Sequence, residues 1–171
     1  MVGSSTRNLF TRFMPTSVLS PKQFEELLPL AVAWAEAQEA RIVADGVALS
    51  PAELSDACTM GVRQRDRVRL LTVDTIPRPE DPRLRAAADA MHFINPFTRG
   101  LTLRYGIYLR RDVASDRFLI AHELAHIAQY ERLGGFFPFL RQYLDECLTI
   151  GYPEAPMEQE AIRKADLLRQ Q

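Results

Sequence analysis

The sequence has 171 residues, a formal net charge of −1, 25% charged residues and 47% hydrophobic residues. This composition is typical of a soluble globular chain, and the near-neutral charge argues against a nucleic-acid or acidic-membrane partner. No apolar run reaches the ~18 residues that a membrane span requires. Cys58 and Cys147 lack metal-ligand spacing and are expected to be free thiols. Residues 1–20 lack the apolar core of a signal peptide, so the expected location is cytoplasmic.

The N-terminal part of the chain is predicted to hold an arm and several helices. Ser20-Pro21-Lys22-Gln23 fits a capping box with proline at the first helical position, and Ser50-Pro51-Ala52-Glu53 repeats that signal. Glycine can end each helix, at Gly46 and at Gly61. The expected elements are a flexible arm over 1–19, helices over 20–45, 50–60 and 83–91, and a proline-marked loop over 77–82.

The C-terminal part is predicted to contain one strand and three helices. Residues 101–110 alternate between apolar and polar side chains, which predicts a single strand. Its apolar side would carry Leu101, Leu103, Tyr105, Ile107 and Leu109. A helix is expected from Asp116 to Gly134, a second from Phe136 to Leu148 with an apolar stripe, and a third that begins at Pro156.

The helix that follows the predicted strand carries a possible metal motif. His122, Glu123 and His126 form the pattern H-E-x-x-H. Residues four apart on a helix share a face, with Cβ atoms roughly 5–6 Å apart, so the two imidazoles can bind one Zn²⁺. Glu123 is about 100° further round, where it can take a proton from a metal-held water instead of binding the metal. The flanking apolar residues predict a buried helix, and two unpaired histidines would be costly there.

A zinc site with two histidines needs a third protein ligand and an open position for water. The last predicted helix offers Glu158 and Glu160, with further candidates in Asp145, Glu146 and Asp166. On a helical wheel Glu158 lies among the apolar residues, whereas Glu160 lies about 200° away. Glu158 is therefore favoured as the ligand. A frayed helix start would turn Glu160 inward instead, so both glutamates stay open.

The segment HELAH, followed about 30 residues later by PMEQEA, resembles the gluzincins, the thermolysin-like zinc peptidases. It looks closest to small bacterial proteins of that type, and the resemblance covers about residues 100–165. In this group the third ligand is a glutamate that opens the pattern E-x-x-A-D. Glu158 matches that pattern as far as the alanine, but Ile162 stands where the aspartate is usual.

The resemblance implies an α+β fold that is mostly helical and zincin-like, with a small antiparallel sheet flanking the H-E-x-x-H helix. Residues 20–171 would form a single metallopeptidase domain. In the group, a strand just before the metal helix forms the edge of the cleft and pairs with extended substrate. Residues 101–110 stand in the corresponding place.

The expected function is zinc-dependent hydrolysis, in the first place of a peptide bond in a peptide or protein substrate. His122, His126 and Glu158 would bind Zn²⁺, and Glu123 would be the general base. Gln129 is seven residues from His122, so it shares the metal face and is expected to orient a ligand. Candidates for the donor to the oxyanion are Tyr143, Tyr152 and Arg141.

Two alternatives stay open. One is a non-catalytic module in which zinc, or no metal, fixes the helices and the protein binds a partner. The small size and the missing aspartate favour it, whereas the intact Glu123 argues against it. The other is a zinc hydrolase with a non-peptide substrate. The sequence carries no signal for substrate identity or oligomeric state.

Overall fold

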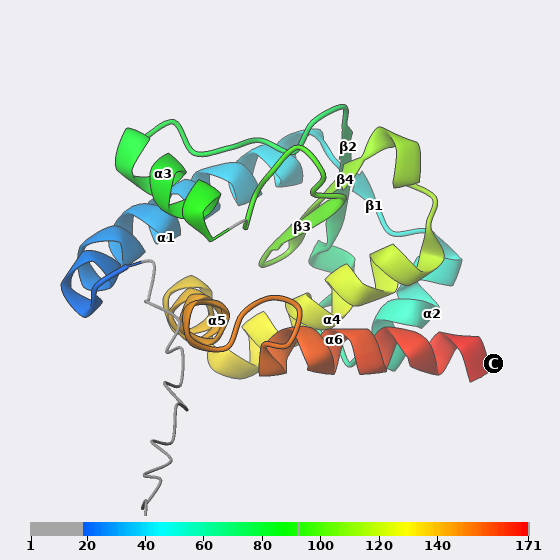
Figure 1. The fold of residues 1–171 in the computed structure, drawn as a ribbon. Coiled ribbons are helices and arrows are strands. Elements are labelled where there is room, and N and C mark those ends of the chain that lie inside the picture. The colour runs from blue at the N-terminus through cyan, green and yellow to red at the C-terminus, as the bar shows by residue number, and fades with distance from the viewer. Residues whose placement is uncertain (1–18, 92, 171) are drawn as a thin grey trace, which may run out of the picture.

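The computed structural model describes residues 19–91 and 93–170 (Figure 1). Its α-helices are α1 (Pro21–Asp45), α2 (Pro51–Met60), α3 (Pro82–Ala90), α4 (Arg117–Leu133), α5 (Phe136–Thr149) and α6 (Pro156–Asp166). Its strands are β1 (Val47–Ala48), β2 (Arg69–Val73), β3 (Gly100–Leu103) and β4 (Gly106–Arg110), and its short 3₁₀ helices are Arg65–Arg67, Arg111–Val113 and Leu167–Gln170. Apart from Leu19, the predicted arm over 1–19 lies outside the described residues. Among the described helices, none combines the length and the apolar character needed to cross a bilayer.

The helix boundaries follow the capping signals in the sequence. The Ser20 hydroxyl accepts the Gln23 N–H at 3.3 Å, and the Gln23 side chain accepts the Ser20 N–H at 2.9 Å. Ser50 and Glu53 repeat this reciprocal pair at 3.3 and 2.7 Å. Gly61 ends α2 at φ +92°, in the left-handed region that favours glycine. These predictions are confirmed because a cap depends only on residues three or four positions apart.

The four strands lie in the order β1-β2-β4-β3. The β1–β2 and β3–β4 pairs are antiparallel, but β2 and β4 are parallel. The protein is therefore mostly helical with a small mixed sheet, an α+β arrangement, and the prediction of a purely antiparallel sheet is wrong. A parallel pair needs a long crossover connection, which the segment containing α3 provides here.

The single strand predicted over residues 101–110 is in fact a hairpin. β3 and β4 are joined at Arg104 and Tyr105, and Arg104 has φ +53°, which is uncommon for a residue other than glycine. Glu39 of α1 holds this turn. Its carboxylate accepts from Nε and Nη2 of Arg104 at 2.9 and 2.5 Å, and from the Tyr105 N–H at 3.1 Å. A residue 65 positions away thus stabilises the turn.

The turn also changes which face the alternating residues occupy. Leu101 pairs with Tyr108 and Thr102 pairs with Ile107, and residues directly opposite each other share a face. Leu101 and Tyr108 belong to the hydrophobic cluster with α1 and α5, whereas Ile107 belongs to the cluster with α2, α4 and α6. The predicted common apolar face is therefore wrong, and Thr102 faces α4.

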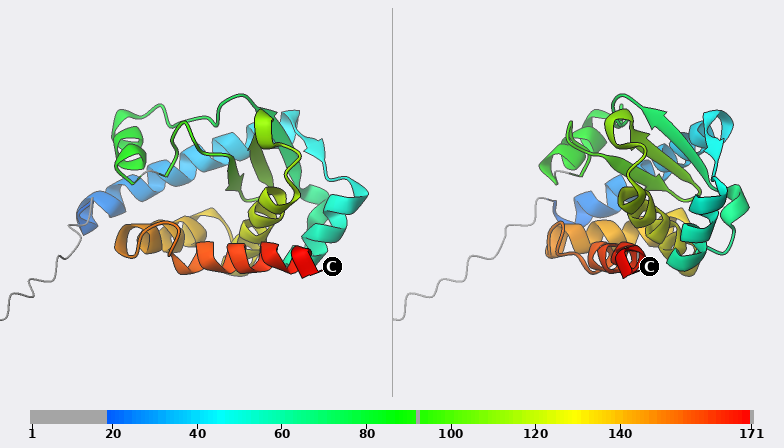
Figure 2. Two further views of the ribbon diagram at one scale, coloured as in Figure 1. Left: turned by 45° about the vertical axis from the view of Figure 1, so that its right-hand side comes forward. Right: turned by 90° about the vertical axis from the view of Figure 1, so that its right-hand side faces the viewer.

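In Figure 2 the sheet, α1 and α3 form an upper layer, and α4, α5 and α6 form a lower layer. Helices cover both faces of the sheet. α1 packs on the face with Tyr108, and α4, which lies between α2 and α6, packs on the face with Ile107. β3 is at the end of the strand order, whereas β4 pairs on both sides. The prediction of an edge strand is confirmed for β3 and wrong for β4.

Candidate metal centre

Helix α4 carries the two histidines, and its limits match the prediction. The Asp116 carboxylate caps its start by accepting the N–H groups of Phe118 and Leu119 at 3.0 and 3.2 Å. Gly134 ends it at φ +93°. Ten of the 17 residues of α4 are buried, so the polar side chains among them need partners.

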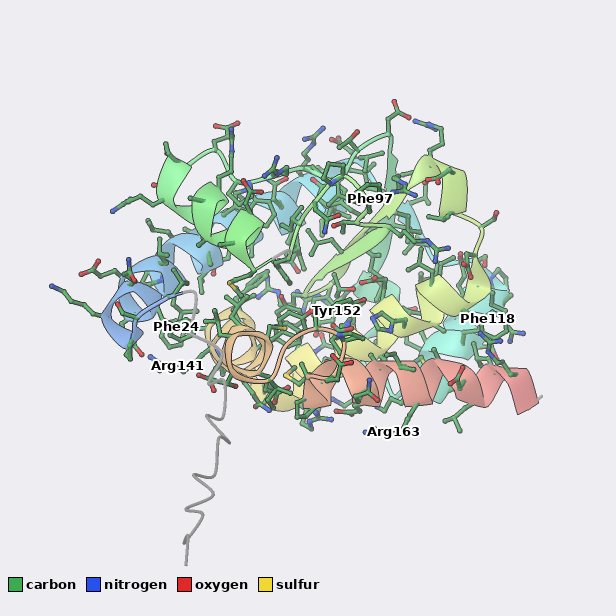
Figure 3. The ribbon with its side chains drawn as sticks, viewed as in Figure 1. Phe24, Phe97, Phe118, Arg141, Tyr152 and Arg163 are labelled. Atoms are coloured by element: carbon green, nitrogen blue, oxygen red, sulfur yellow. The ribbon has the colours of Figure 1, made fainter. Side chains whose placement is uncertain are left out.

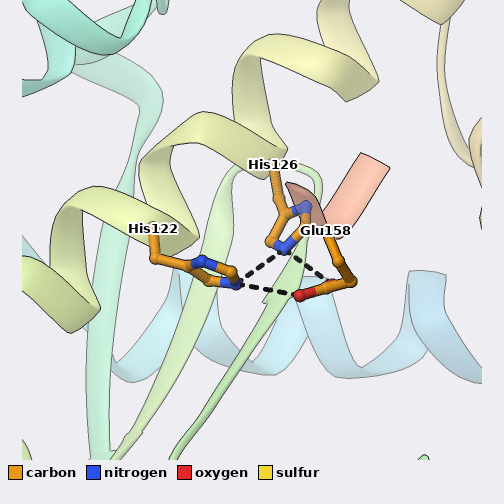
Figure 4. Close-up of side chains that lie close together, drawn as sticks. All are labelled: His122, His126 and Glu158. Atoms are coloured by element: carbon orange, nitrogen blue, oxygen red, sulfur yellow. Dashed lines mark hydrogen bonds and ion pairs between the residues drawn. The ribbon is translucent and has the colours of Figure 1, made fainter. Parts of the chain in front are cut away.

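Helix α6 brings a carboxylate to these histidines. Because α6 begins at Pro156, Glu158 lies in its first turn, where it is 1% exposed. Nε2 of His122 and Nε2 of His126 are 3.1 Å apart. Oε1 of Glu158 lies 3.2 Å from the His126 nitrogen, and Oε2 lies 3.3 Å from the His122 nitrogen (Figure 4). The three residues predicted as metal ligands are thus brought together.

The spacing of these donor atoms fits a tetrahedral metal ion. Zinc–ligand bonds of ~2.0–2.1 Å at tetrahedral angles put neighbouring ligand atoms roughly 3.3–3.4 Å apart. The two imidazole nitrogens are 3.1 Å apart, and each lies 3.2–3.3 Å from a different oxygen of the Glu158 carboxylate. Within the described part of the chain, the buried Oε2 of Glu158 accepts no well-oriented hydrogen bond. A buried carboxylate oxygen without a partner is costly. His122, His126 and Glu158 could therefore hold a metal ion.

Gln129 orients His126, as its spacing predicted. The Gln129 amide group donates to the Met157 carbonyl at 2.9 Å and to Oε2 of Glu160 at 3.2 Å. Its Oε1 therefore faces Nδ1 of His126, at 2.8 Å. Nδ1 must carry the proton of this hydrogen bond, so in the neutral imidazole the lone pair is on Nε2. This is the tautomer in which His126 can bind a metal through Nε2.

Tyr143 of α5 holds the glutamate. Its hydroxyl donates to Oε1 of Glu158 at 2.6 Å. Burial and the neighbouring carboxylate raise the pKa of Tyr143 well above its ordinary value, so it remains a donor. Burial alone would raise the pKa of Glu158, but the contacts with His122 and His126 outweigh it and hold that pKa well below its usual range. Glu158 is therefore ionised at neutral pH, the state that binds a cation.

Glu160 points away from the centre. Its two carboxylate oxygens each accept from Arg132 of α4 at 2.8 Å, and this pairing lowers the pKa of Glu160 to about 2. The Glu160 side chain is 25% exposed, against 2% for Glu158. The helical wheel correctly placed Glu158 on the buried side of the helix and Glu160 on the more exposed side, because α6 is regular from Pro156 onward.

Glu123 projects from α4 towards β3 and is 5% exposed. The Thr102 hydroxyl lies 2.6 Å from Oε2 of Glu123 and 3.0 Å from its backbone carbonyl oxygen. A Cβ atom on Gly100 would lie 2.5 Å from Oε1, so a larger residue there would require the Glu123 carboxylate to shift. The sequence analysis missed Gly100 and Thr102, because no local pattern marks residues that meet Glu123 only through the fold.

The three oxyanion candidates have different surroundings. Tyr143 is engaged with Glu158. Arg141 donates to both carboxylate oxygens of Glu25 on α1, at 2.9 and 2.6 Å. Tyr152 lies in the loop between α5 and α6, is 66% exposed and lines the same cavity as the metal residues (Figure 3). Of the three, Tyr152 is therefore the one best placed to meet a ligand in the cavity.

A cavity of about 660 Å³ contains the centre. His122, Glu123, His126 and Glu158 all line it, so the possible base and the possible metal ligands share one space. Its volume falls within the roughly 300–1,000 Å³ that is usual for ligand-binding pockets. The four side chains therefore border the space in which a ligand would bind.

Comparison with known proteins identifies no relative of this chain. No family model, no curated protein and no solved structure matches it. The chemistry of the centre therefore has to be inferred from its residues and their geometry.

Proposed function

We propose that this chain is a zinc-dependent hydrolase of the gluzincin type, with a zincin-like fold, that cleaves peptide bonds. The main support is the convergence of His122, His126 and Glu158 at 3.1–3.3 Å in the cavity that Glu123 also lines. Two histidines and a glutamate, with a fourth position left for water, form one of the donor sets of catalytic zinc. Magnesium and calcium prefer sites made of oxygen ligands alone.

The surrounding residues have distinct roles in this proposal. Bound zinc would polarise the scissile carbonyl and lower the pKa of the attacking water. Gln129 keeps the Nε2 lone pair of His126 directed into the centre, and Tyr143 keeps the Glu158 carboxylate in place. Glu123 accepts a proton from the attacking water and delivers it to the leaving amine.

The position of β3, at the end of the strand order and along the cavity wall, supports a peptide substrate. An extended peptide can add to an exposed sheet edge through backbone hydrogen bonds, and proteins usually protect such edges. β3 carries Thr102, whose hydroxyl contacts Glu123. A peptide aligned along β3 would therefore pass next to the proposed base.

The test compares the parent with Glu123→Gln. Both should contain about one zinc per chain by elemental analysis, because Glu123 does not bind the metal. Cleavage of a mixed fluorogenic peptide library should fall by about 10²–10⁴-fold, since the amide accepts no proton. Glu154→Gln, at an exposed glutamate before α6, is the matched control and should keep both properties. Unchanged cleavage by Glu123→Gln would remove Glu123 from the mechanism, and loss of its zinc would contradict the proposed ligand geometry.

The Thr102 contact also supports a second candidate, a non-catalytic module stabilised by zinc. In that case the buried Glu123 serves to attach α4 to β3 through the hydroxyl of Thr102. The parent would then bind zinc and cleave no member of the library. Glu123→Gln would lower the melting temperature more than Glu154→Gln does.

A further inference from the structure

The part of the cavity away from the metal centre is lined by the N-terminal helices. We call this part the apolar chamber and define it by three residues from α1 and three from α3. They are Leu28, Ala31, Trp34, Leu84, Ala87 and Ala88. The chamber and the metal centre belong to one continuous cavity. A molecule bound at the metal can therefore extend into the chamber.

The chamber offers no partner for a charged group. All of the described cavity-lining residues from α1 and α3 are apolar. The charged lining residues outside the metal centre are Arg99, Asp116 and Arg169, which come from other elements. A charged group that enters the chamber would lose its hydration and meet no opposite charge, and the only side-chain donor among the six chamber residues is the indole N–H of Trp34. An apolar group gains by leaving water.

Two aromatic side chains with large exposed areas also line this cavity. Phe97 is 83% exposed and precedes β3, and Tyr152 is 66% exposed and precedes α6 (Figure 3). They come from opposite layers of the molecule. Exposed apolar side chains gathered at a cavity are typical of ligand-binding sites. An apolar ligand would cover them as it enters.

We propose that the apolar chamber binds a bulky apolar segment of the peptide substrate, comprising two or more large apolar side chains next to the scissile bond. This inference rests on the proposed peptidase function and names its substrate class. The whole cavity, metal centre included, has a volume of about 660 Å³, that of a site for a drug-sized molecule, so a bound segment can be larger than one side chain. The selectivity would come from α1 and α3, far in sequence from the metal motif.

The first test measures binding without catalysis. Trp34 is the only tryptophan in the chain and lines the chamber, so its fluorescence should report occupancy. The probes are 1-butanol, 1-hexanol and 1-octanol, with 1,6-hexanediol as the polar counterpart of 1-hexanol. Affinity should rise about fourfold per methylene, or about 200-fold from butanol to octanol. Equal affinity across the series would overturn the proposal.

Two substitutions on α1 locate the binding. Ala31 lines the chamber, whereas Ala37 is exposed on the same helix. Ala31→Phe should lower octanol affinity by at least about tenfold, because the added phenyl ring fills more space than two methylenes, each worth about fourfold. Ala37→Phe should leave the affinity unchanged. Leu27→Ser is the substitute variant if Ala31→Phe does not fold. It changes a residue of α1 that also lines the cavity, without adding volume, and should weaken octanol binding severalfold. Equal affinity in Leu27→Ser and the parent would overturn the proposal.

A third variant tests whether the chain's own N-terminal segment is the occupant. Leu9, Phe10 and Phe13 precede Leu19, which lines the cavity. The triple substitution of these residues to serine should leave octanol affinity unchanged. A rise of tenfold or more would assign the chamber to that segment and overturn its assignment to substrate.

The last test asks whether the chamber determines which peptides are cleaved. Two peptides would be compared, one with Phe-Leu and one with Ser-Asn next to the scissile bond. The zinc-loaded parent should cleave the first at least tenfold faster, and Ala31→Phe should lose that preference. Equal cleavage would overturn this inference while the proposed function stands. Chain-length-dependent alcohol binding without cleavage of any peptide would overturn the proposed function and support the chamber as an apolar site.

Discussion

The two ends of the cavity are built in different ways. At the metal end, polar side chains are fixed by hydrogen bonds, such as those from His126 to Gln129 and from Tyr143 to Glu158. The apolar chamber at the other end is formed by packing alone. A hydrogen-bond network fails when one member is removed, whereas apolar packing tolerates changes that conserve volume. Metal binding should therefore be sensitive to single substitutions at one end, and selectivity should be adjustable at the other.

The largest expected effect comes from the two glutamates of α6. Glu158→Ala should weaken zinc binding by several orders of magnitude, because the proposed site loses one of its three ligands and the only one that carries a negative charge. Glu160→Ala should change zinc affinity by less than about tenfold, since Glu160 reaches the centre only through Gln129. Zinc affinity measured against a competing chelator gives both values.

The opposite result would move the third ligand to Glu160. Small and equal losses in both variants would show that neither glutamate binds the metal. The metal end of the cavity would then be no more sensitive to single substitutions than the apolar chamber.

A smaller effect is expected at Gln129, which contacts a ligand and not the metal. Gln129→Met removes the acceptor for Nδ1 of His126 and should weaken zinc binding about 10–100-fold. Arg132→Met breaks the pair with Glu160 but keeps the contact between Gln129 and His126, so it is the control and should weaken binding less. If both variants bind zinc like the parent, the tautomer of His126 is not set by Gln129.

The smallest effect concerns the N-terminus of α4. Asp116→Ala removes the cap of the metal helix and should lower the free energy of unfolding by about 1 kcal/mol (range 0.5–2). Urea unfolding at pH 7 gives this value. Asp112→Ala removes an equal charge from a surface pair with Arg110 without freeing a helix N–H, so its effect should be smaller.

The same cap has a defined pH dependence. Hydrogen bonding from the N–H of Leu119, and also of Phe118, lowers the pKa of Asp116 below its ordinary 3.8. A lowered pKa in the folded state means that the stabilisation is complete above pH ~4 and is lost as the pH falls below that value. The stability difference between the parent and Asp116→Ala should therefore shrink in acid. A difference that stays constant down to pH 2 would show that the cap is not the cause.

The parts of the site that the sequence predicted are those set by the period of a helix. The spacing of His122 and His126, the position of Gln129 seven residues on, and the inward side of α6 all follow from 3.6 residues per turn. The inward side then distinguished Glu158 from Glu160. None of these predictions needed a contact between distant segments beyond the packing of two helices.

The parts that the sequence did not predict depend on contacts between distant segments. The two central residues of the turn, Arg104 and Tyr105, include no glycine or asparagine to mark it, and Glu39 of α1 stabilises it instead. The alternation over residues 101–110 therefore predicted one strand instead of two. The neighbours of Glu123 were missed for the same reason, since Thr102 reaches it only after the hairpin has formed.

The contact between Glu39 and the hairpin determines which part of the chain would have to be transferred together with the motif. Residues 100–165 contain H-E-x-x-H and Glu158, yet they lack the carboxylate that holds Arg104 at its positive φ. The hairpin turn sets where Thr102 lies, and Thr102 contacts Glu123. A scaffold that receives this stretch by grafting would need an acidic side chain of its own at the turn. The unit that could be inherited or engineered as a whole therefore starts at α1, well before the residues that would bind the metal.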